Sequence, residues 1–200
     1  MINFTAMLLQ EYRSYANPAA KIARMVKSGK LTPIIRGLYE TDASVPGYCL
    51  SGVIYGPSCL SFEFALSWHN LIPEAVFAFT SATCGKGRKK SYTTPFGLFT
   101  YRDVPVSVFP YGVTLHAEKG YGFLLASPER AISDMVYTRP PCRNRKELGE
   151  LLFEDLRIDE EDFRNLNLDD IIELSGLYHT VNHRLLASLA ASVKRHRGKT

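Results

Sequence analysis

The 200-residue sequence has no long apolar run, and this absence excludes the simplest kind of membrane protein. None of its hydrophobic stretches approaches the ~20 residues that a helix needs to cross a bilayer. The first residues, MINFTAMLLQEYRSY, also lack the basic start and the small-residue cleavage site of a secretory signal peptide. We therefore expect a cytoplasmic protein with no membrane partner.

Cysteine is scarce as well. The four cysteines are Cys49, Cys59, Cys84 and Cys142, and no two of them form a Cys-x-x-Cys pair. Because a structural zinc site needs clustered soft ligands, this spacing argues against a metal site. We expect small, mostly buried thiols in a reducing compartment.

The motifs of common hydrolases and metalloenzymes are missing too. There is no Gly-x-Ser-x-Gly elbow and no phosphate-cradling loop. His179 and His183 are spaced so that a helix would place both on one face, but no Glu lies between them as in His-Glu-x-x-His. Glu118 and Lys119 are adjacent, so a strand would point them to opposite faces. We predict no catalytic, cofactor-binding or metal-binding residue and no enzymatic activity.

What the sequence does have is an uneven distribution of charge. The net charge is only +4, but residues 1–42 hold six Lys or Arg against three acids. Four more cations lie in CGKGRKK at 84–90 and four in KRHRGK at 194–199, whereas residues 147–173 carry eleven acids. This pattern predicts a basic start, an acidic segment and a basic end.

The basic start has the pattern of two helices followed by two strands. One helix is expected over residues 4–12, and a second would be capped by Asn17, begin at Pro18 and stop at Gly29. At 100° per residue, the second helix separates an apolar face from a cationic face. These faces are Ala19, Ile22, Ala23 and Val26, opposite Lys21, Arg24 and Lys27. Two short strands would then surround a turn at Arg36-Gly37.

The remaining sequence predicts a mixed domain and then a helical region. Two helices broken at Gly56-Pro57 are expected first, with Ser58 opening the second, followed by a buried strand over AVFAFTSAT at 75–83. An antiparallel meander of four or five short strands follows, and Ser127 with Pro128 opens a further helix. The last helices are expected over 144–154, 160–175 and 178–196.

Two groups of cations are candidates for binding nucleic acid. A cationic helix face followed by a basic turn can neutralise phosphates, although a solvated helix face is the ordinary alternative. The CGKGRKK segment could be a mobile phosphate-contacting loop or an exposed hairpin loop kept soluble by charge. The expected DNA-binding residues are Lys21, Arg24, Lys27, Lys30, Arg36, Lys86, Arg88, Lys89 and Lys90.

Four segments, in the same order, resemble motifs of the AbiEi-type antitoxin family. They are KIARMVKSGKLTPIIRGLYETD, SCLSFEFALSWHNLIPEAVFAFTSAT, TTPFGLFTYRDVP and GFLLASPERAISDMVY, within residues 18–140. The first resembles the end of a winged helix, with Lys21, Arg24 and Lys27 on the recognition helix and Lys30 and Arg36 beside the wing. Asn70 replaces a glycine that often follows His69, which is tolerable because asparagine also adopts left-handed conformations.

The resemblance implies an antitoxin of a type IV toxin–antitoxin module linked to abortive phage infection, which often also represses its own promoter. Its partners would be inverted repeats in its own promoter and, functionally, a nucleotidyltransferase toxin, without a stable complex being required. A complete winged helix has three helices before its wing, whereas only sixteen residues precede Asn17. We therefore expect a reduced winged-helix-like module.

The expected fold is α+β, with a reduced winged-helix-like module at 1–43, a mixed helix and antiparallel-sheet domain at 44–140, and a helical region at 141–200. The expected function is that of an antitoxin and DNA-binding autoregulator. The alternatives are a protein-interaction module that does not bind DNA and a nucleic-acid-processing enzyme.

Overall fold

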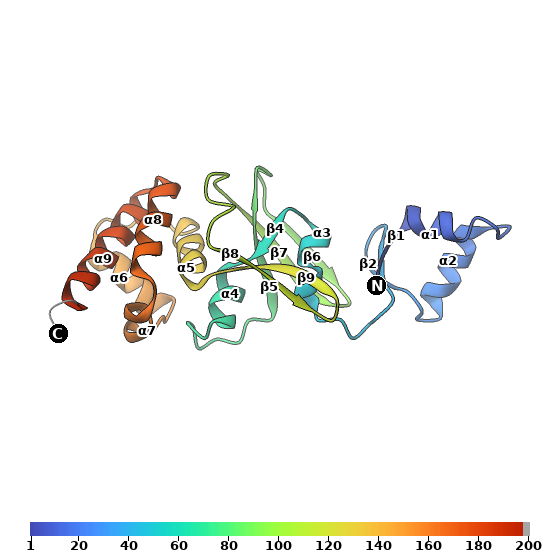
Figure 1. Ribbon diagram of the computed structural model, residues 1–200, viewed down its shortest axis with the longest axis horizontal. Helices are drawn as coiled ribbons and strands as arrows, with labels where there is room; N and C mark the ends of the chain where they lie inside the picture. Colours follow the sequence, from blue (N-terminus) through green and yellow to red (C-terminus); the bar gives the residue numbers. More distant parts are fainter. Residues whose placement is uncertain (198–200) are drawn as a thin grey trace.

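A computed structural model describes residues 1–197, and it confirms the expected α+β class (Figure 1). A small unit of helices and strands lies at one end of the long axis, a larger sheet occupies the middle, and helices fill the other end (Figure 1). Within residues 1–197, every helix is too short or too polar to cross a membrane.

The N-terminal unit is built on a three-stranded antiparallel sheet. Its elements are β1 (Ile2–Phe4), α1 (Thr5–Glu11), α2 (Pro18–Lys27), β2 (Thr32–Ile35) and β3 (Leu38–Glu40). The strand order is β1-β3-β2, with Asn3 opposite Tyr39. The sequence did not predict β1, because a strand of three residues has too little alternation to show itself and depends on pairing with β3, more than thirty residues away.

The second helix has the ends that the sequence predicts. The side-chain oxygen of Asn17 accepts a hydrogen bond from the Ala20 amide at 2.9 Å, and Pro18 is the first helical residue. Gly29 follows the helix with a φ of +71°, a conformation that favours glycine.

The packing face of α2 agrees with the predicted one at Ile22 and Val26 and differs from it at Ala19 and Ala23. Ile22 is buried and packs with Leu8 and Leu31 in a small core of this unit. Met25 and Val26 lean on the same core, whereas Ala19 and Ala23, predicted to pack, are exposed. The reason is that Leu8 of α1, Leu31 and Tyr39 pack on the side of α2 that carries its larger apolar side chains, which bury more area per residue.

The central sheet is mixed, so the predicted antiparallel meander is wrong. In residues 1–197 its order is β6-β7-β5-β4-β9-β8, in which β5 runs parallel to β7 and β4 parallel to β9. β6 pairs antiparallel with β7, and β8 with β9, as a meander requires. The strands β7 and β8, which a meander would also pair, are separated by β5, β4 and β9. The strands are β4 (Ser58–Leu60), β5 (Ala78–Cys84), β6 (Lys90–Thr94), β7 (Gly97–Val104), β8 (Val113–Glu118) and β9 (Tyr121–Ala126).

The segment before the sheet also differs from prediction. A 3₁₀ turn η1 (Gly47–Leu50) and the short helix α3 (Ser51–Ile54) come first, and Ser58, expected to open a helix, instead begins β4. The next helix is α4 (Phe62–Trp68). After it, Asn70 has a left-handed φ of +58°, a conformation that we expected asparagine to tolerate here. Ser58 lies in a strand because β4 pairs on both sides within the sheet, a tertiary effect that the local sequence does not carry.

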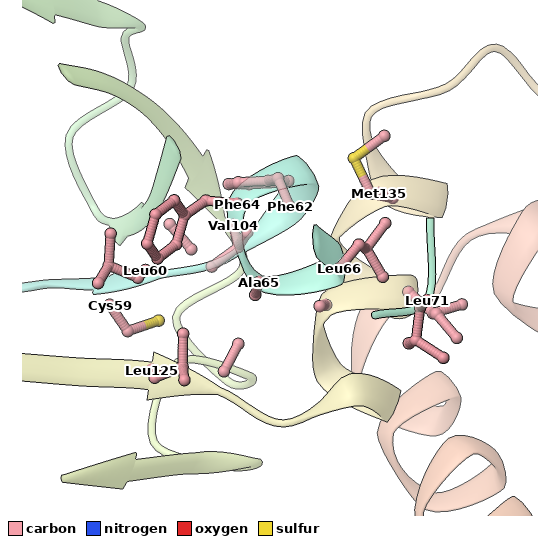
Figure 2. Close-up of a cluster of buried hydrophobic side chains, with 14 of the residues drawn as sticks. Cys59, Leu60, Phe62, Phe64, Ala65, Leu66, Leu71, Val104, Leu125 and Met135 are labelled. Carbon is pink, nitrogen blue, oxygen red and sulfur yellow. The ribbon is translucent and has the colours of Figure 1, made fainter. Parts of the chain in front are cut away.

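The main core lies where the sheet meets α4 and α5 (Pro128–Tyr137). Figure 2 shows Leu60 and Leu125 from adjacent strands beside Phe62 and Leu66 of α4, with Met135 of α5 completing the cluster. As predicted, Ser127 caps α5, accepting a hydrogen bond from the Arg130 amide at 3.2 Å. Residues 129–136 of α5 are buried by this packing, and its last residue, Tyr137, lies at the surface.

The C-terminal helices form a layer against α5 (Figure 1). The expected helix over 160–175 is divided at Leu166-Asn167, where the Asn167 side chain caps a new helix. His179 has a φ of +55° and ends α8, so His179 and His183 do not share a helical face as predicted. The elements are α6 (Arg145–Glu150), the π-helical turn η2 (Leu151–Asp155), α7 (Glu160–Asn165), α8 (Leu168–Tyr178) and α9 (Val181–Arg197).

The predicted divisions at 43/44 and 140/141 stay predictions. One apolar cluster runs from Ile34 to Ala190 and includes residues from all three expected parts. Of the predicted basic tail, Lys199 lies outside the described residues.

Candidate nucleic-acid interface

Arg24 and Lys27 occupy the exposed side of α2, away from Ile22. The Nε of Arg24 donates to the Ala20 carbonyl at 3.3 Å, and neither cation forms an ion pair with any residue in 1–197. The small side chains Ala20 and Ala23 share this side. Because the two alanine side chains are short, the backbone of α2 can approach another molecule closely, and Arg24 and Lys27 supply positive charge beside them.

Lys21 is placed differently from Arg24 and Lys27. Its Nζ lies 5.0 Å from the ring centroid of Tyr15 and 6.0 Å from that of Tyr12, and its side chain is half-buried. Such cation–aromatic contacts are worth about 0.5–1 kcal/mol at exposed sites. Lys21 therefore helps to join α2 to the segment that follows α1, and its charge lies at the edge of the cationic face.

The predicted turn residues lie beside the three-stranded sheet. Arg36 and Gly37 form the turn between β2 and β3, and Gly37 has a φ of +86°. Arg36 is exposed, and so is Lys30, which precedes β2. The structure thus gathers Lys21, Arg24, Lys27, Lys30 and Arg36 in one small unit.

The CGKGRKK segment is not a hairpin loop, and its backbone is anchored to the rest of the protein. It joins β5 to β6, which are not neighbours, because β7 lies between them. The carboxylate of Asp103 anchors it by accepting hydrogen bonds from the amides of Lys86 and Gly87, at 2.7 and 2.6 Å. Arg88 also donates to the Tyr55 hydroxyl at 3.3 Å. The backbone of the loop at Lys86 and Gly87 and the side chain of Arg88 are therefore held in place.

The nine predicted cations form two groups and not one surface. Five belong to the N-terminal unit, and the other four, Lys86 and 88–90, belong to the central sheet (Figure 1). Sequence reasoning missed that a hollow of about 330 Å³ adjoins the second group, lined by Arg88, Lys89, Arg102 and Tyr137 among others. Of the basic stretch TRPPCRNR that follows Tyr137, only Thr138 lines this hollow, so its arginines were no signal for it.

The most polar part of the core is inaccessible to a substrate. Asp134 is fully buried and accepts hydrogen bonds from Arg130 Nε at 3.0 Å and from the hydroxyls of Ser61 and Tyr178, each at 2.5 Å. Burial, with the Asp134 charge nearby, raises the pKa of Tyr178 well above its usual value. These groups hold α4, α5 and α8 together and lie too deep to act on another molecule.

The cysteines and histidines do not assemble a reactive or metal-binding centre in residues 1–197. No group of three His, Cys, Asp or Glu side chains in that range is placed to hold a metal ion. Burial raises the pKa of Cys59 to about 12 and that of Cys49 to about 11, so both stay protonated at neutral pH. Neither thiol is therefore suited to nucleophilic attack.

Comparison with protein-family models and with curated protein sequences gives no match to this chain. Its likeness to the AbiEi-type antitoxins thus depends on the four segments quoted above.

Proposed function

We propose that the chain is the antitoxin of a type IV, AbiE-like module and that its N-terminal unit is a reduced winged helix that binds DNA. The observation that carries this proposal is the order β1-α1-α2-β2-β3 on a sheet β1-β3-β2, with an exposed cationic side on α2 and an arginine at the β2–β3 turn. In a winged helix the helix before the wing enters the major groove and the wing contacts the backbone.

The surface chemistry of α2 supports this use. The short side chains of Ala20 and Ala23 let the exposed side of α2 enter the major groove of DNA, where Arg24 and Lys27 can contact phosphates or base edges. Arg36 lies where a wing would meet the backbone. Lys21, held against two tyrosines, would contribute mainly to the fold of the unit.

A mobility-shift assay on the DNA upstream of the chain's own gene tests the proposal. We expect a specific, salt-sensitive shift at sub-micromolar protein, because specific sites usually bind at ~10⁻⁸ M or tighter. The variant Arg24→Ala/Lys27→Ala/Arg36→Ala should abolish the shift or weaken it strongly. It should also lower the salt slope by ~0.9 for each phosphate that the protein no longer neutralises.

Arg157→Ala is the matched control, because Arg157 is an exposed arginine paired with Glu74 far from the N-terminal unit in the sequence. Its shift should equal that of the unaltered chain. Absence of a specific shift with the unaltered chain would sink the repressor part of the proposal. An unchanged shift in the triple variant would place the DNA surface elsewhere.

The antitoxin part predicts that a nucleotidyltransferase is encoded beside the chain's gene, and co-expression of the chain with that enzyme tests it separately. The intact chain should restore growth, and the Arg24→Ala/Lys27→Ala/Arg36→Ala variant should do so equally well when both are expressed from unrelated promoters. Persistent toxicity with the intact chain would count against an antitoxin.

A protein-interaction role is the second candidate, and exposed apolar side chains favour it. Phe4 and Met7 of the N-terminal unit are 48% and 57% exposed. If these side chains bind a protein partner, Phe4→Ser/Met7→Ser should remove toxin neutralisation while leaving the DNA shift intact, which separates the two roles.

A further inference from the structure

Three segments that are distant in the sequence meet around Tyr137, the last residue of α5. On one side is the hollow of about 330 Å³ formed with the loop that carries Arg88 and Lys89. On the other is a second hollow of about 420 Å³, whose lining includes Arg139 and Arg184, at the start of α9. Tyr137 lines both hollows.

The ring of Tyr137 is held in place from the protein side. It lies 5.6 Å, centroid to centroid, from the ring of Tyr178, which is itself stacked on His183 at 3.9 Å with an interplanar angle of 5°. Tyr178 and His183 are buried, whereas Tyr137 is 36% exposed. Tyr137 is therefore the outermost ring of a fixed aromatic group, and part of its surface remains available to another molecule.

The charge around this ring is positive. Arg88, Lys89, Arg139 and Arg184 are all exposed, and over the described part of the chain none of them forms an ion pair. Among the described residues, the one carboxylate that lines either hollow, that of Asp103, is occupied by the amides of the loop. Each hollow thus offers two guanidinium or ammonium groups to an anion.

We propose that this surface, defined by Tyr137 with Arg88, Lys89, Arg139 and Arg184, binds a single-stranded nucleic acid. An unpaired base would stack on the exposed part of Tyr137, and the phosphates before and after it would lie against the cations of the two hollows. An aromatic platform between cations is the arrangement that single strands use. Duplex DNA keeps its bases stacked, and an acidic peptide would use the cations but not the ring.

The inference does not depend on the proposed DNA-binding role of α2. The test uses fluorescence anisotropy of the full chain with labelled U₁₀ RNA, dT₁₀ and a 20-base-pair duplex. All variants are made in the Arg24→Ala/Lys27→Ala/Arg36→Ala background, so that the N-terminal unit cannot supply the signal. A failure here leaves the operator shift of the intact chain untouched.

Tyr137→Ala should weaken binding of the single strands about 5- to 150-fold, the range that corresponds to the loss of one stacked base. Tyr137→Phe should stay within about twofold, because it keeps the ring. Arg139→Gln/Arg184→Gln should weaken binding and flatten its dependence on salt. Arg157→Gln, at an exposed arginine paired with Glu74, should bind as the parent does.

Folding of each variant is checked by circular dichroism, and Arg139→Gln/Arg184→Gln keeps the test valid if Tyr137→Ala does not fold, since it changes only exposed side chains. Cross-linking of 4-thiouridine RNA should label the peptide that contains Tyr137. Equal affinity for the duplex, equal binding by Tyr137→Ala, or full competition by polyglutamate at the same charge concentration would each overturn the proposal.

Discussion

His183 is a histidine whose surroundings favour the neutral ring. It is buried in α9, its Nε2–H donates to the Ser133 carbonyl at 3.0 Å, and its Nδ1 lies 2.7 Å from the Thr180 hydroxyl. Burial lowers its pKa from 6.5 to about 4, despite the opposing effect of the Ser133 carbonyl. As the pH falls below 6.5, His183 becomes protonated in the unfolded chain but stays neutral in the folded chain. Stability is therefore lost between pH 6.5 and about 4.

His183→Gln should therefore flatten this loss. We expect the unaltered chain to lose up to about 3 kcal/mol of unfolding free energy to this group between pH 7 and 4. The variant should be less stable at pH 7 but should fall less steeply over the same interval. Urea unfolding at several pH values measures this, with His179→Asn, at the exposed neighbour, as control. Equal slopes in the variant and the unaltered chain would contradict the assignment.

Asp134 is the residue on which the buried polar cluster depends. Asp134→Ala should lower the unfolding free energy by about 3–5 kcal/mol, because the Arg130 charge would stay buried without its partner. Replacing both in Arg130→Met/Asp134→Leu should restore a large part of the loss, since an apolar pair needs no charge compensation. Urea unfolding of both variants is the measurement. A double variant no better than the single one would show that the pair stabilises more than its apolar replacement.

Among the elements, the entry into η1 is packed too closely for any side chain at Gly47. A Cβ there would overlap the ring of Phe79 and the carbonyl oxygen of Phe96. At Gly176, in α8, an added Cβ would meet no such atom of residues 1–197 within 4 Å. The two glycines therefore have different roles. Gly47 leaves room for Phe79 and for the turn between β6 and β7, whereas Gly176 only lowers the helix propensity of α8.

Gly47→Ala should destabilise the chain by about 1–3 kcal/mol or more, the usual range for overpacking. Gly176→Ala should raise the unfolding free energy by about 0.5–1 kcal/mol, because alanine is the better helix former. Thermal unfolding of both variants checks this pair. Similar melting temperatures for the two would refute the packing described at η1.

Across the molecule as a whole, Glu40 links the N-terminal unit to the central sheet. It is fully buried at the end of β3, ion-paired with the N-terminal amine of Met1, and accepts a hydrogen bond from the Tyr121 hydroxyl of β9 at 2.7 Å. Burial opposes its ionisation, but these partners and the Asp42 amide outweigh burial and lower its pKa. This contribution is complete above the unfolded pKa, near 4.5, and is lost as the pH falls below it.

Tyr121→Phe should loosen this link. We expect faster amide exchange over residues 32–40, and little change in α8 and α9, when hydrogen–deuterium exchange is followed by mass spectrometry. Tyr48→Phe is the control, because Tyr48 donates a comparable bond to Glu118 at 2.6 Å within the central part. Faster exchange over 32–40 in the control alone, or in neither variant, would show that Glu40 does not hold the two parts together.

Sequence reasoning succeeded where the signal is local. The Asn17 and Ser127 caps, the stop at Gly29 and the left-handed Asn70 each depend on a residue's own conformational preferences. It failed at β1, at Ser58 and in the order of the central sheet, because short strands are fixed by partners far along the chain. The candidate site divides in the same way, since the five cations of the N-terminal unit are near one another in sequence and Tyr137 is not near Arg88.

The class of the fold, the ends of α2 and α5, and the cations of α2 could all be read from the chain before it folds, because charge and capping act over a few residues. Folding was needed to show that Ala19 and Ala23 are exposed, that Lys21 is held by two tyrosines, and that the CGKGRKK loop is anchored by Asp103. Folding also brought Tyr137 into one hollow with Arg88 and into another with Arg184. Burial and contact between distant segments depend on which elements pack together, and this packing depends on all the residues of the core and not on a local stretch of sequence.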